Sequence, residues 1–316
     1  MSIREVVILG TASQVPTRDR AHHGALLRFD DEGILLDPGE GTQRQLTLAG
    51  LTTSGISRVC ITHVHGDHCL GVPGVVQRCS LDGRTTPLPI HFPETAEPTI
   101  RALCSATPFE EVTPIELHPQ RPGPVTGAPG RLRIRAVELS HRLPTLGWRF
   151  DEPDGWRLDP ERAQGAGIEG PARSEVLREG VVQIGDRMVR VEEVADPRPG
   201  QSVAFVMDTR WCDGALELAN GVDLLIVEAT FLESEAALAD EAGHLTAAQA
   251  ARLGWQAGAR RVVLTHLSQR YPDLDGHREE AEKAAPHLDL HVAADLDRIA
   301  VPPRDVPDPG RGTRSR

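Results

Sequence analysis

The chain contains 316 residues, 39% of them hydrophobic and 25% charged, which is typical of a soluble globular protein with one large domain or two small ones. Its net charge of −12 argues against a general nucleic-acid-binding surface, because phosphate contacts need Lys or Arg. Lys283 is the only lysine, so an anionic substrate would have to be held by local arginines.

We expect neither a membrane span nor a secretion signal in this sequence. No stretch approaches the roughly 20 consecutive apolar residues of a membrane span, and the N-terminus lacks a basic region followed by a long apolar one. Five cysteines are scattered without CxxC spacing, which suits a reducing compartment. We therefore expect a cytoplasmic protein.

The first predicted elements form a β-hairpin pattern followed by a short helix. Apolar runs flanking the turn "DDEG" predict strands, and "TQRQLTLAGL" predicts a helix that ends at Gly50. Further along, "RVCITH" (58–63) is typical of a buried strand and "GVVQRC" (74–79) of the start of a helix.

The second half begins with a loop and an alternating strand. Pro and Gly predict a loop over 121–130, and the alternation of Arg with apolar residues in 131–141 predicts a strand with one buried face. From 151 to about 200 the weak, polar pattern predicts an irregular or separately folded arm. Buried strands follow at 202–209, 223–230 and 260–267, with a helix at 246–258 and a disordered tail at 301–316.

At least five predicted strands end in a metal-ligating or acid–base residue: His63, His141, Asp208, Glu228 and His266. Strands of one sheet share an end, so the loops that leave this end can converge on one site. Mixed strands and helices with such an edge indicate a layered α/β sandwich.

The stretch "ITHVHGDHCL" (61–70) places His63, His65, Asp67 and His68 within six positions. Gly66 and the alternation predict an extended loop, in which the first two face one point and the last two another. Imidazole and carboxylate suit zinc, or else manganese or iron. A carboxylate without thiolates is typical of an open, catalytic site, whereas a surface cluster without function is the disfavoured alternative.

"THVHGDH" matches the HxHxDH signature of the metallo-β-lactamase superfamily, and the chain as a whole resembles the ribonuclease Z family of tRNA 3′-processing endonucleases. The resemblance covers residues 8 to about 271 and is carried by "LGTASQVPT", "LDPGEGTQRQL", "SHRLPTLGWRF", "MDTR", "VEATF" and "THLSQRY". It implies an α+β fold, a four-layer αββα sandwich. The domain would span 1–300, with a protruding exosite arm inserted at about 151–200.

The resemblance also implies two zinc ions per subunit, with Mn²⁺ or Fe²⁺ as alternatives. The first zinc would be bound by His63, His65 and His141, the second by Asp67, His68 and His266, and Asp208 would bridge them. His141 alone could be a core histidine, but its flanking sequence favours a ligand. We interpret Cys69 as a buried small hydrophobe.

Two such metals can share a hydroxide that attacks phosphorus in line. Asp67 would orient the water and accept its proton. The resemblance implies that His244 and Glu228 form a proton-donating pair and that Arg270 contacts the phosphate. The alternatives are a helix-start cap for His244, a turn cap for Glu228 and a surface role for Arg270.

Some residues depart from the family pattern. Val227 stands where the family usually has His, and Leu245 where a Ser is common. The stretch 167–180 resembles the Gly-Pro motif of the exosite, yet 151–200 holds seven Arg against twelve Asp and Glu, a net charge of −5. Phosphate binding by this arm would need its arginines on one face: Arg157, Arg162, Arg173 and Arg178.

The leading hypothesis is a zinc endoribonuclease that removes the 3′ trailer from precursor tRNA, as a homodimer like the family's bacterial members. One alternative is a phosphodiesterase for cyclic nucleotides or other small phosphodiesters. Another is a non-catalytic tRNA-binding metalloprotein, which the complete ligand set disfavours. The remaining histidines are expected to have no role in the site: His22, His23, His91, His118, His277, His287 and His291.

Overall fold

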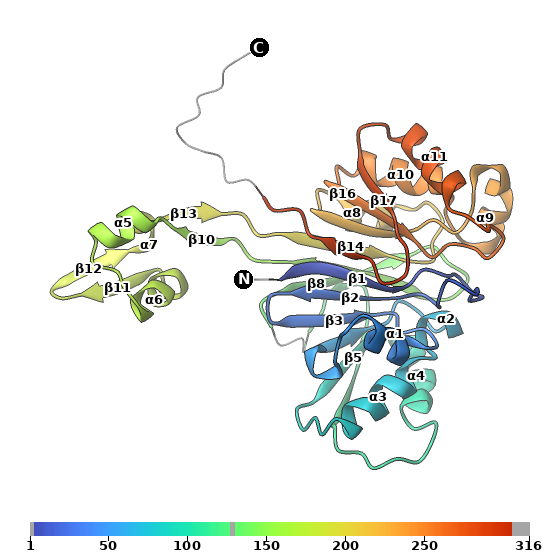
Figure 1. Cartoon of the computed structure of the whole chain (residues 1–316), viewed down its shortest axis with the longest axis horizontal. Helices are drawn as coiled ribbons and strands as arrows, with labels where there is room; N and C mark the ends of the chain where they lie inside the picture. Colours follow the sequence, from blue (N-terminus) through green and yellow to red (C-terminus); the bar gives the residue numbers. More distant parts are fainter. Residues whose placement is uncertain (1–2, 127–129, 305–316) are drawn as a thin grey trace. The chain divides into compact units, whose positions relative to one another are not determined.

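A computed structural model of the chain describes residues 3–126 and 130–304, and Figure 1 shows its helices and strands. Within the described part of the predicted tail, residues 301–304 form no helix or strand. The rest of that tail, 305–316, lies outside the described residues. Among the helices described, none is long and apolar enough to cross a membrane.

The first of two seven-stranded sheets is built mostly from the N-terminal third of the chain. Its strand order is β18-β1-β2-β3-β4-β5-β6, with β1 Arg4–Gly10, β2 Gly24–Phe29, β3 Glu32–Leu36, β4 Arg58–Cys60, β5 Leu88–Pro93, β6 Ile115–Gln120 and β18 Arg298–Ala300. The associated helices are α1 Thr42–Leu48, α2 Gly66–Cys69, α3 Val72–Leu81 and α4 Glu97–Cys104, with short 3₁₀ turns at Thr53–Gly55 and Glu94–Ala96. The predicted β2–β3 hairpin is confirmed. The first helix ends at Leu48, not Gly50, and α3 begins two residues before the predicted start.

The second sheet has the order β17-β16-β15-β14-β9-β8-β7. Its strands are β7 Gly123–Pro124, β8 Arg133–Leu139, β9 Thr145–Asp151, β14 Ser202–Val206, β15 Leu224–Glu228, β16 Arg261–Thr265 and β17 Asp289–Val292. The helices of this half are α8 Asp213–Ala219, α9 Ala236–Ala242, α10 Ala247–Gln256 and α11 Asp275–Ala284, with a 3₁₀ turn at Glu233–Glu235. The three strands predicted after residue 200 all form, and β14 to β17 are parallel neighbours.

Three apolar clusters define four layers of helices and sheets, built from the chain before residue 151 and after residue 201. Between the sheets, Ile8 and Leu27 of the first pack with Trp148 and Phe205 of the second. A second cluster joins the first sheet to α1, α3 and α4. A third joins the second sheet to α8, α10 and α11. The order helix–sheet–sheet–helix, visible in Figure 1, confirms the αββα sandwich.

The segment Asp151–Gln201 forms a compact unit of its own. It contains the antiparallel pairs β10 Gly155–Leu158 with β13 Ala195–Arg198 and β11 Val181–Ile184 with β12 Arg187–Arg190, and the helices α5 Pro160–Gly165, α6 Pro171–Glu179 and α7 Val191–Val194. Its core holds small aliphatic side chains: Ala163, Ile168, Val176, Val182, Val189, Val191, Val194 and Ala195. Of the two alternatives predicted, the structure therefore favours the separately folded arm. Elements of four to nine residues are too short to display a clear period.

The prediction of an extended loop over 63–68 is wrong in its second half. Residues 66–69 form the one-turn helix α2, closed by a hydrogen bond from the Leu70 amide to the Gly66 carbonyl of 2.9 Å. A single turn is too short to reveal itself by apolar spacing. His63 and His65 precede this turn, whereas Asp67 and His68 lie on it.

Candidate functional site

The five metal-ligating or acid–base residues predicted at strand ends belong to two sheets rather than one. His63 follows β4 of the first sheet, whereas His141, Asp208, Glu228 and His266 end or follow strands of the second. The expectation of a single shared sheet edge is therefore wrong for His63. The two sheets pack face to face, which lets loops from both reach one place.

Backbone strain accompanies this convergence. Asp208 and His266 have positive φ values of 44° and 59°, and so does Asp37, at 43°. Non-glycine residues rarely adopt this region, at about 1–3 kcal/mol each, and the surrounding packing must impose it. Each turns its side chain toward the site immediately after a strand.

Two groups of potential ligands lie side by side, and Asp208 faces both. In the first, His63 Nε2 lies 2.9 Å from His65 Nδ1, and His65 Nδ1 lies 3.3 Å from His141 Nε2. Asp208 Oδ2 lies 3.5 Å from His63 Nε2. These four residues bring one donor atom each within 4.8 Å of one another.

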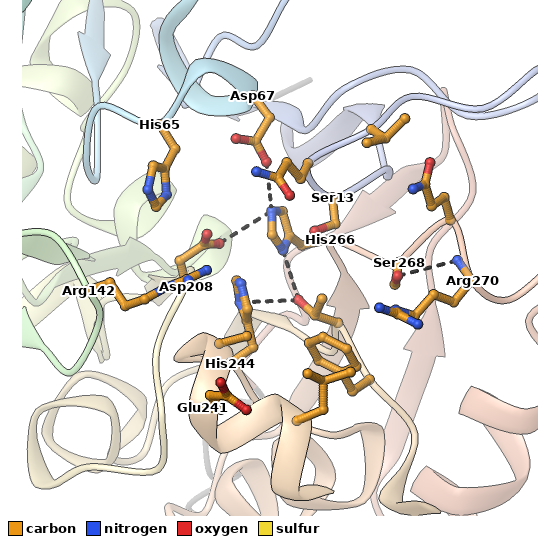
Figure 2. Close-up of a pocket in the computed structure, with 17 residues that line it drawn as sticks. Ser13, His65, Asp67, Arg142, Asp208, Glu241, His244, His266, Ser268 and Arg270 are labelled. Atoms are coloured by element: carbon orange, nitrogen blue, oxygen red, sulfur yellow. Dashed lines mark hydrogen bonds and ion pairs between the residues drawn. The ribbon is translucent and has the colours of Figure 1, made fainter. Parts of the chain in front are cut away.

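The second group consists of Asp67, His68 and His266, again within 4.8 Å. His68 Nε2 is 3.1 Å from His266 Nε2, which is 3.3 Å from Asp67 Oδ2. The other oxygen of Asp208, Oδ1, lies 3.4 Å from His68 and 3.3 Å from His266. Figure 2 shows Asp67 and Asp208 on either side of His266.

The donor atoms fit divalent cations. Asp208 Oδ1 is buried and accepts no hydrogen bond from the described residues, although a buried carboxylate oxygen normally has a partner. Two neutral imidazoles that point ring nitrogens at each other about 3 Å apart can place only one proton between them. A cation in that place can accept the lone pairs of both nitrogens. Neutral imidazoles and carboxylates are ligands of zinc and similar metals. The cluster is a divalent-metal site.

Burial sets the protonation of the first group. It lowers the pKa of His65 and His141, and that of His63 to well below its usual range, which keeps these rings in the form that binds a metal. Burial raises the pKa of Asp208, but His266, His68 and other histidines outweigh it and hold that pKa well below its ordinary value. The carboxylate is therefore charged.

Buried acceptors orient the ligand rings. Asp37 Oδ2 lies 2.8 Å from His68 Nδ1, and the carboxylate also accepts from the Thr62 amide and hydroxyl, at 2.6 Å each. The Gly243 carbonyl accepts from His141 Nδ1 at 2.8 Å. Partners of this kind fix the tautomer and orientation of a ligating imidazole. The sequence analysis missed Asp37, although it lies in the "LDPGEG" block.

The proposed acid pair is in contact. His244 Nδ1 lies 2.9 Å from Glu228 Oε1, and Glu228 is fully buried, accepting also from the Thr209 amide and the Thr230 hydroxyl. Burial lowers the pKa of His244, but Glu228 and Asp208 outweigh it and raise the pKa to about 9. The contact with Glu228 therefore favours the protonated form of His244.

The alternative of a helix-cap role for His244 is wrong, because the side chain that caps α10 belongs to Thr246.

The two residues that depart from the family pattern, Val227 and Leu245, have a structural role. Val227 and Leu245 are fully buried in the apolar cluster beneath α10. They leave the contact between His244 and Glu228 intact.

The site opens into a cavity of about 340 Å³. Arg270 lines it, with a guanidinium nitrogen 3.8 Å from Glu235, and its amide donates to the Ser268 hydroxyl. A second arginine of the lining, Arg142, was missed by the sequence analysis, although it directly follows His141. Figure 2 shows Arg142 and Arg270 on opposite sides of the metal site.

Among the histidines expected to have no role, His23 lies against the metal site. Its ring is fully buried, 5.5 Å from that of His68 and 5.6 Å from that of His266. Burial holds the pKa of His23 well below its usual range, so the ring is neutral. The other six histidines do not line the cavity formed by the described residues.

Cys69, next to the ligand His68, is buried, and burial raises the pKa of its thiol to about 12. Both observations agree with its interpretation as a small hydrophobe.

Comparisons with known proteins identify the family of the chain. A family model described as the metallo-beta-lactamase superfamily matches residues 18–206, and another described as a beta-lactamase superfamily domain matches 189–267. A ribonuclease Z from Nocardia farcinica is 52% identical over 307 residues, covering 96% of this chain and 100% of that protein. The chain belongs to the ribonuclease Z family.

Other members of the ribonuclease Z family are similarly close. The protein from Salinispora arenicola is 50% identical over 98% of this chain and its own full length. The crystal structure of human tRNase Z, short form, has a TM-score of 0.66 and 25% identity, covering 94% of this chain and 99% of that one. A metallo-beta-lactamase fold protein from Bacillus subtilis, with a TM-score of 0.69 and 18% identity, shows the shared fold.

Proposed function

We infer that the chain is a metal-dependent endoribonuclease that removes the 3′ trailer from precursor tRNA. The observation that carries this conclusion is the contact between His244 and Glu228 beside two ligand groups that face one carboxylate, Asp208. A metal pair with a protonated imidazole next to it suits the cleavage of a phosphodiester with a poor leaving group. Identity of 52% over nearly the whole chain to a ribonuclease Z supports this substrate.

We propose that the cluster holds two zinc ions. His63, His65 and His141 would bind one, Asp67, His68 and His266 would bind the other, and Asp208 would contribute to both. The absence of thiolates from both groups supports an open, catalytic site, and the mixture of imidazole and carboxylate leaves Mn²⁺ or Fe²⁺ as alternatives. When bound, the metals act as Lewis acids that polarise the phosphoryl oxygens and lower the pKa of water.

Four side chains of the site have proposed roles in activating water, donating a proton and binding the phosphate. Asp67, 7% exposed at the floor of the cavity, orients the attacking water and accepts its proton. His244 donates its proton to the departing 3′ oxygen. Glu228 acts as a positioning residue, because its carboxylate fixes the imidazole and favours its charged form. Arg270 contacts the phosphate at the cavity wall.

We propose that Asp151–Gln201 is the exosite arm within a domain of residues 1–300, and that the protein acts as a homodimer. The arm follows from the resemblance of 167–180 to the Gly-Pro motif of bacterial ribonuclease Z exosites, and the dimer from the resemblance to the family's bacterial members, which are homodimers. We expect the enzyme in the cytoplasm, because all five cysteines are unpaired, as suits a reducing compartment. Light scattering at micromolar concentration tests the dimer, which a monomer mass would exclude.

The decisive experiment is an assay of purified, metal-replete protein with a trailer-bearing precursor tRNA and, separately, with cyclic AMP. We expect cleavage of the precursor at the 3′ end of the mature sequence, mapped by primer extension. Hydrolysis of cyclic AMP without cleavage of the precursor would overturn the proposed function in favour of a small-molecule phosphodiesterase. Absence of both activities would favour a tRNA-binding metalloprotein. Metal analysis of the same preparation tests the expected two zinc ions per chain.

A further inference from the structure

Arg142 is an arginine of the cavity that no part of the metal site uses. Its side chain is exposed and lines the cavity, and within the described residues no carboxylate pairs with it. In a chain with a net charge of −12, most arginines near the site are engaged. Arg270 lies 3.8 Å from Glu235, and Arg210 lies 3.6 Å from Asp240.

His141, the residue before Arg142, is held next to His244. His141 donates to the Gly243 carbonyl, and its ring lies 5.2 Å from that of His244. Arg142 therefore lies at the end of the cavity that holds His244, whereas Arg270 lies at the other end (Figure 2).

This placement gives the bound strand a direction. If His244 donates its proton to the departing 3′ oxygen, the nucleotide that carries this oxygen lies at the His244 end. The next backbone phosphate on its 5′ side then comes nearest to Arg142. A guanidinium is suited to this contact, because it is always charged and can donate two parallel hydrogen bonds to one phosphate.

We propose that Arg142 binds the backbone phosphate on the 5′ side of the last nucleotide of the mature tRNA, and so positions the scissile linkage over the metal site. The proposal rests on the proposed function. It makes Arg142 a substrate-binding residue specific for polynucleotides, since a small phosphodiester has no neighbouring phosphate for it to hold.

The test compares wild-type protein with Arg142→Ala on a precursor tRNA and on bis(p-nitrophenyl) phosphate. We expect the variant to lose about tenfold in kcat/KM on the precursor, with the small diester rate and the metal content unchanged. The slope of log(kcat/KM) against log salt should become shallower by about one. Arg133→Ala is the matched control, because Arg133 is an exposed arginine of β8, the strand that leads to His141, and does not line the cavity.

A second experiment uses precursors that carry one uncharged methylphosphonate in a 2′-deoxy linkage. In one precursor this linkage lies directly 5′ of the last mature nucleotide. In the other it lies within the trailer, one linkage beyond the scissile bond. Matched precursors carry the same 2′-deoxy sugar with a normal phosphate. On the 5′ methylphosphonate substrate, wild type and Arg142→Ala should be equal, whereas the trailer-side substrate should keep the difference.

Three outcomes would overturn the inference. They are equal activity of both proteins on the unmodified precursor, an undiminished loss on the 5′ methylphosphonate substrate, and an equal loss on the small diester. Failure of the wild-type protein to cleave any precursor would instead overturn the proposed function, so the two failures are distinguishable.

Discussion

The metal site and the arm use charged residues in opposite ways. In the metal site, Asp37 and Glu228 are fully buried, and each accepts several hydrogen bonds. In the arm Asp151–Gln201, Arg178 pairs with Glu179 and Arg187 with Glu193 through side chains that are 40–69% exposed. Buried charges need fixed partners, whereas exposed pairs contribute roughly 0–1 kcal/mol and are screened by salt.

Catalysis and substrate binding therefore depend on different kinds of charged residue. The chemistry depends on desolvated groups whose geometry the αββα core imposes. The arm has a small apolar core and a net charge of −5, and Arg162, one of the four arginines needed for phosphate binding, pairs with Asp196 and Asp159. Arg162 and Arg178 would therefore have to exchange an ion pair for a phosphate contact if they bind tRNA.

The largest expected effect is at the metal site. Asp67→Ala should lower kcat by about 10⁴-fold on precursor tRNA and on a small diester alike, at the top of the range for a positioned base, because Asp67 orients and deprotonates the water. Steady-state kinetics with both substrates measure this. Asp31→Ala, at an exposed hairpin position, is the control, and a loss of less than tenfold in Asp67→Ala would contradict the assigned role.

His244→Asn should slow cleavage by roughly 10²–10³-fold, since a positioned acid contributes about 10²–10⁴-fold. Metal content should stay at the wild-type value because His244 is assigned as an acid. Kinetics and elemental analysis of the same preparation check both statements. Loss of metal in this variant would show that His244 is a ligand, as its position near Asp208 and His266 also allows.

The pH profile distinguishes the acid role further. The rate should be constant where His244 is protonated and should fall as pH rises through its pKa, which is about 9 in the metal-free protein. Bound divalent cations repel that proton and move the fall to lower pH. The alkaline fall should disappear in His244→Asn, and an unchanged fall would assign it to another group.

Removal of the arm should have a smaller, substrate-selective effect. Because Gly155 pairs with Arg198, 156–197 can be replaced by an Asn-Gly turn that joins adjacent strands. We expect KM for precursor tRNA to rise about tenfold or more, with the small diester rate unchanged. The narrower deletion of 155–180 has the same expected direction but leaves β13 without its partner strand. Equal losses on both substrates would contradict the exosite assignment.

The smallest expected effect comes from freeing one arm arginine. Glu179→Gln removes the partner of Arg178, 2.7 Å away, and should lower KM for precursor tRNA about twofold, in line with roughly 0.2–1 kcal/mol for a surface pair. Glu217→Gln, which frees Arg135 outside the arm, is the matched control. An equal change in both variants would mean that net charge, and not the arm, governs binding.

Most of the site chemistry can be inferred from residue types and their spacing along the chain. His63, His65, Asp67 and His68 are separated by one residue at most, and the strand ends at His141, Asp208 and His266 lie in specific sequence blocks. Residue types and their spacing can be read directly from the sequence. Because few residue types can bind a metal, a close cluster of them is informative. The buried strands were predictable for the same reason, since continuous apolar runs need a core.

How these segments come together depends on long-range packing that the sequence pattern does not show. Asp37 contacts His68 across 31 positions of the chain, and Arg142 faces a cavity built from segments as distant as Ser13 and Arg270. The helical turn at 66–69 and the separate core of the arm were likewise hidden, because short elements carry too few residues to show a period. Long-range packing, rather than local pattern, brings both sheets to one metal site and leaves the charges of the arm at its surface.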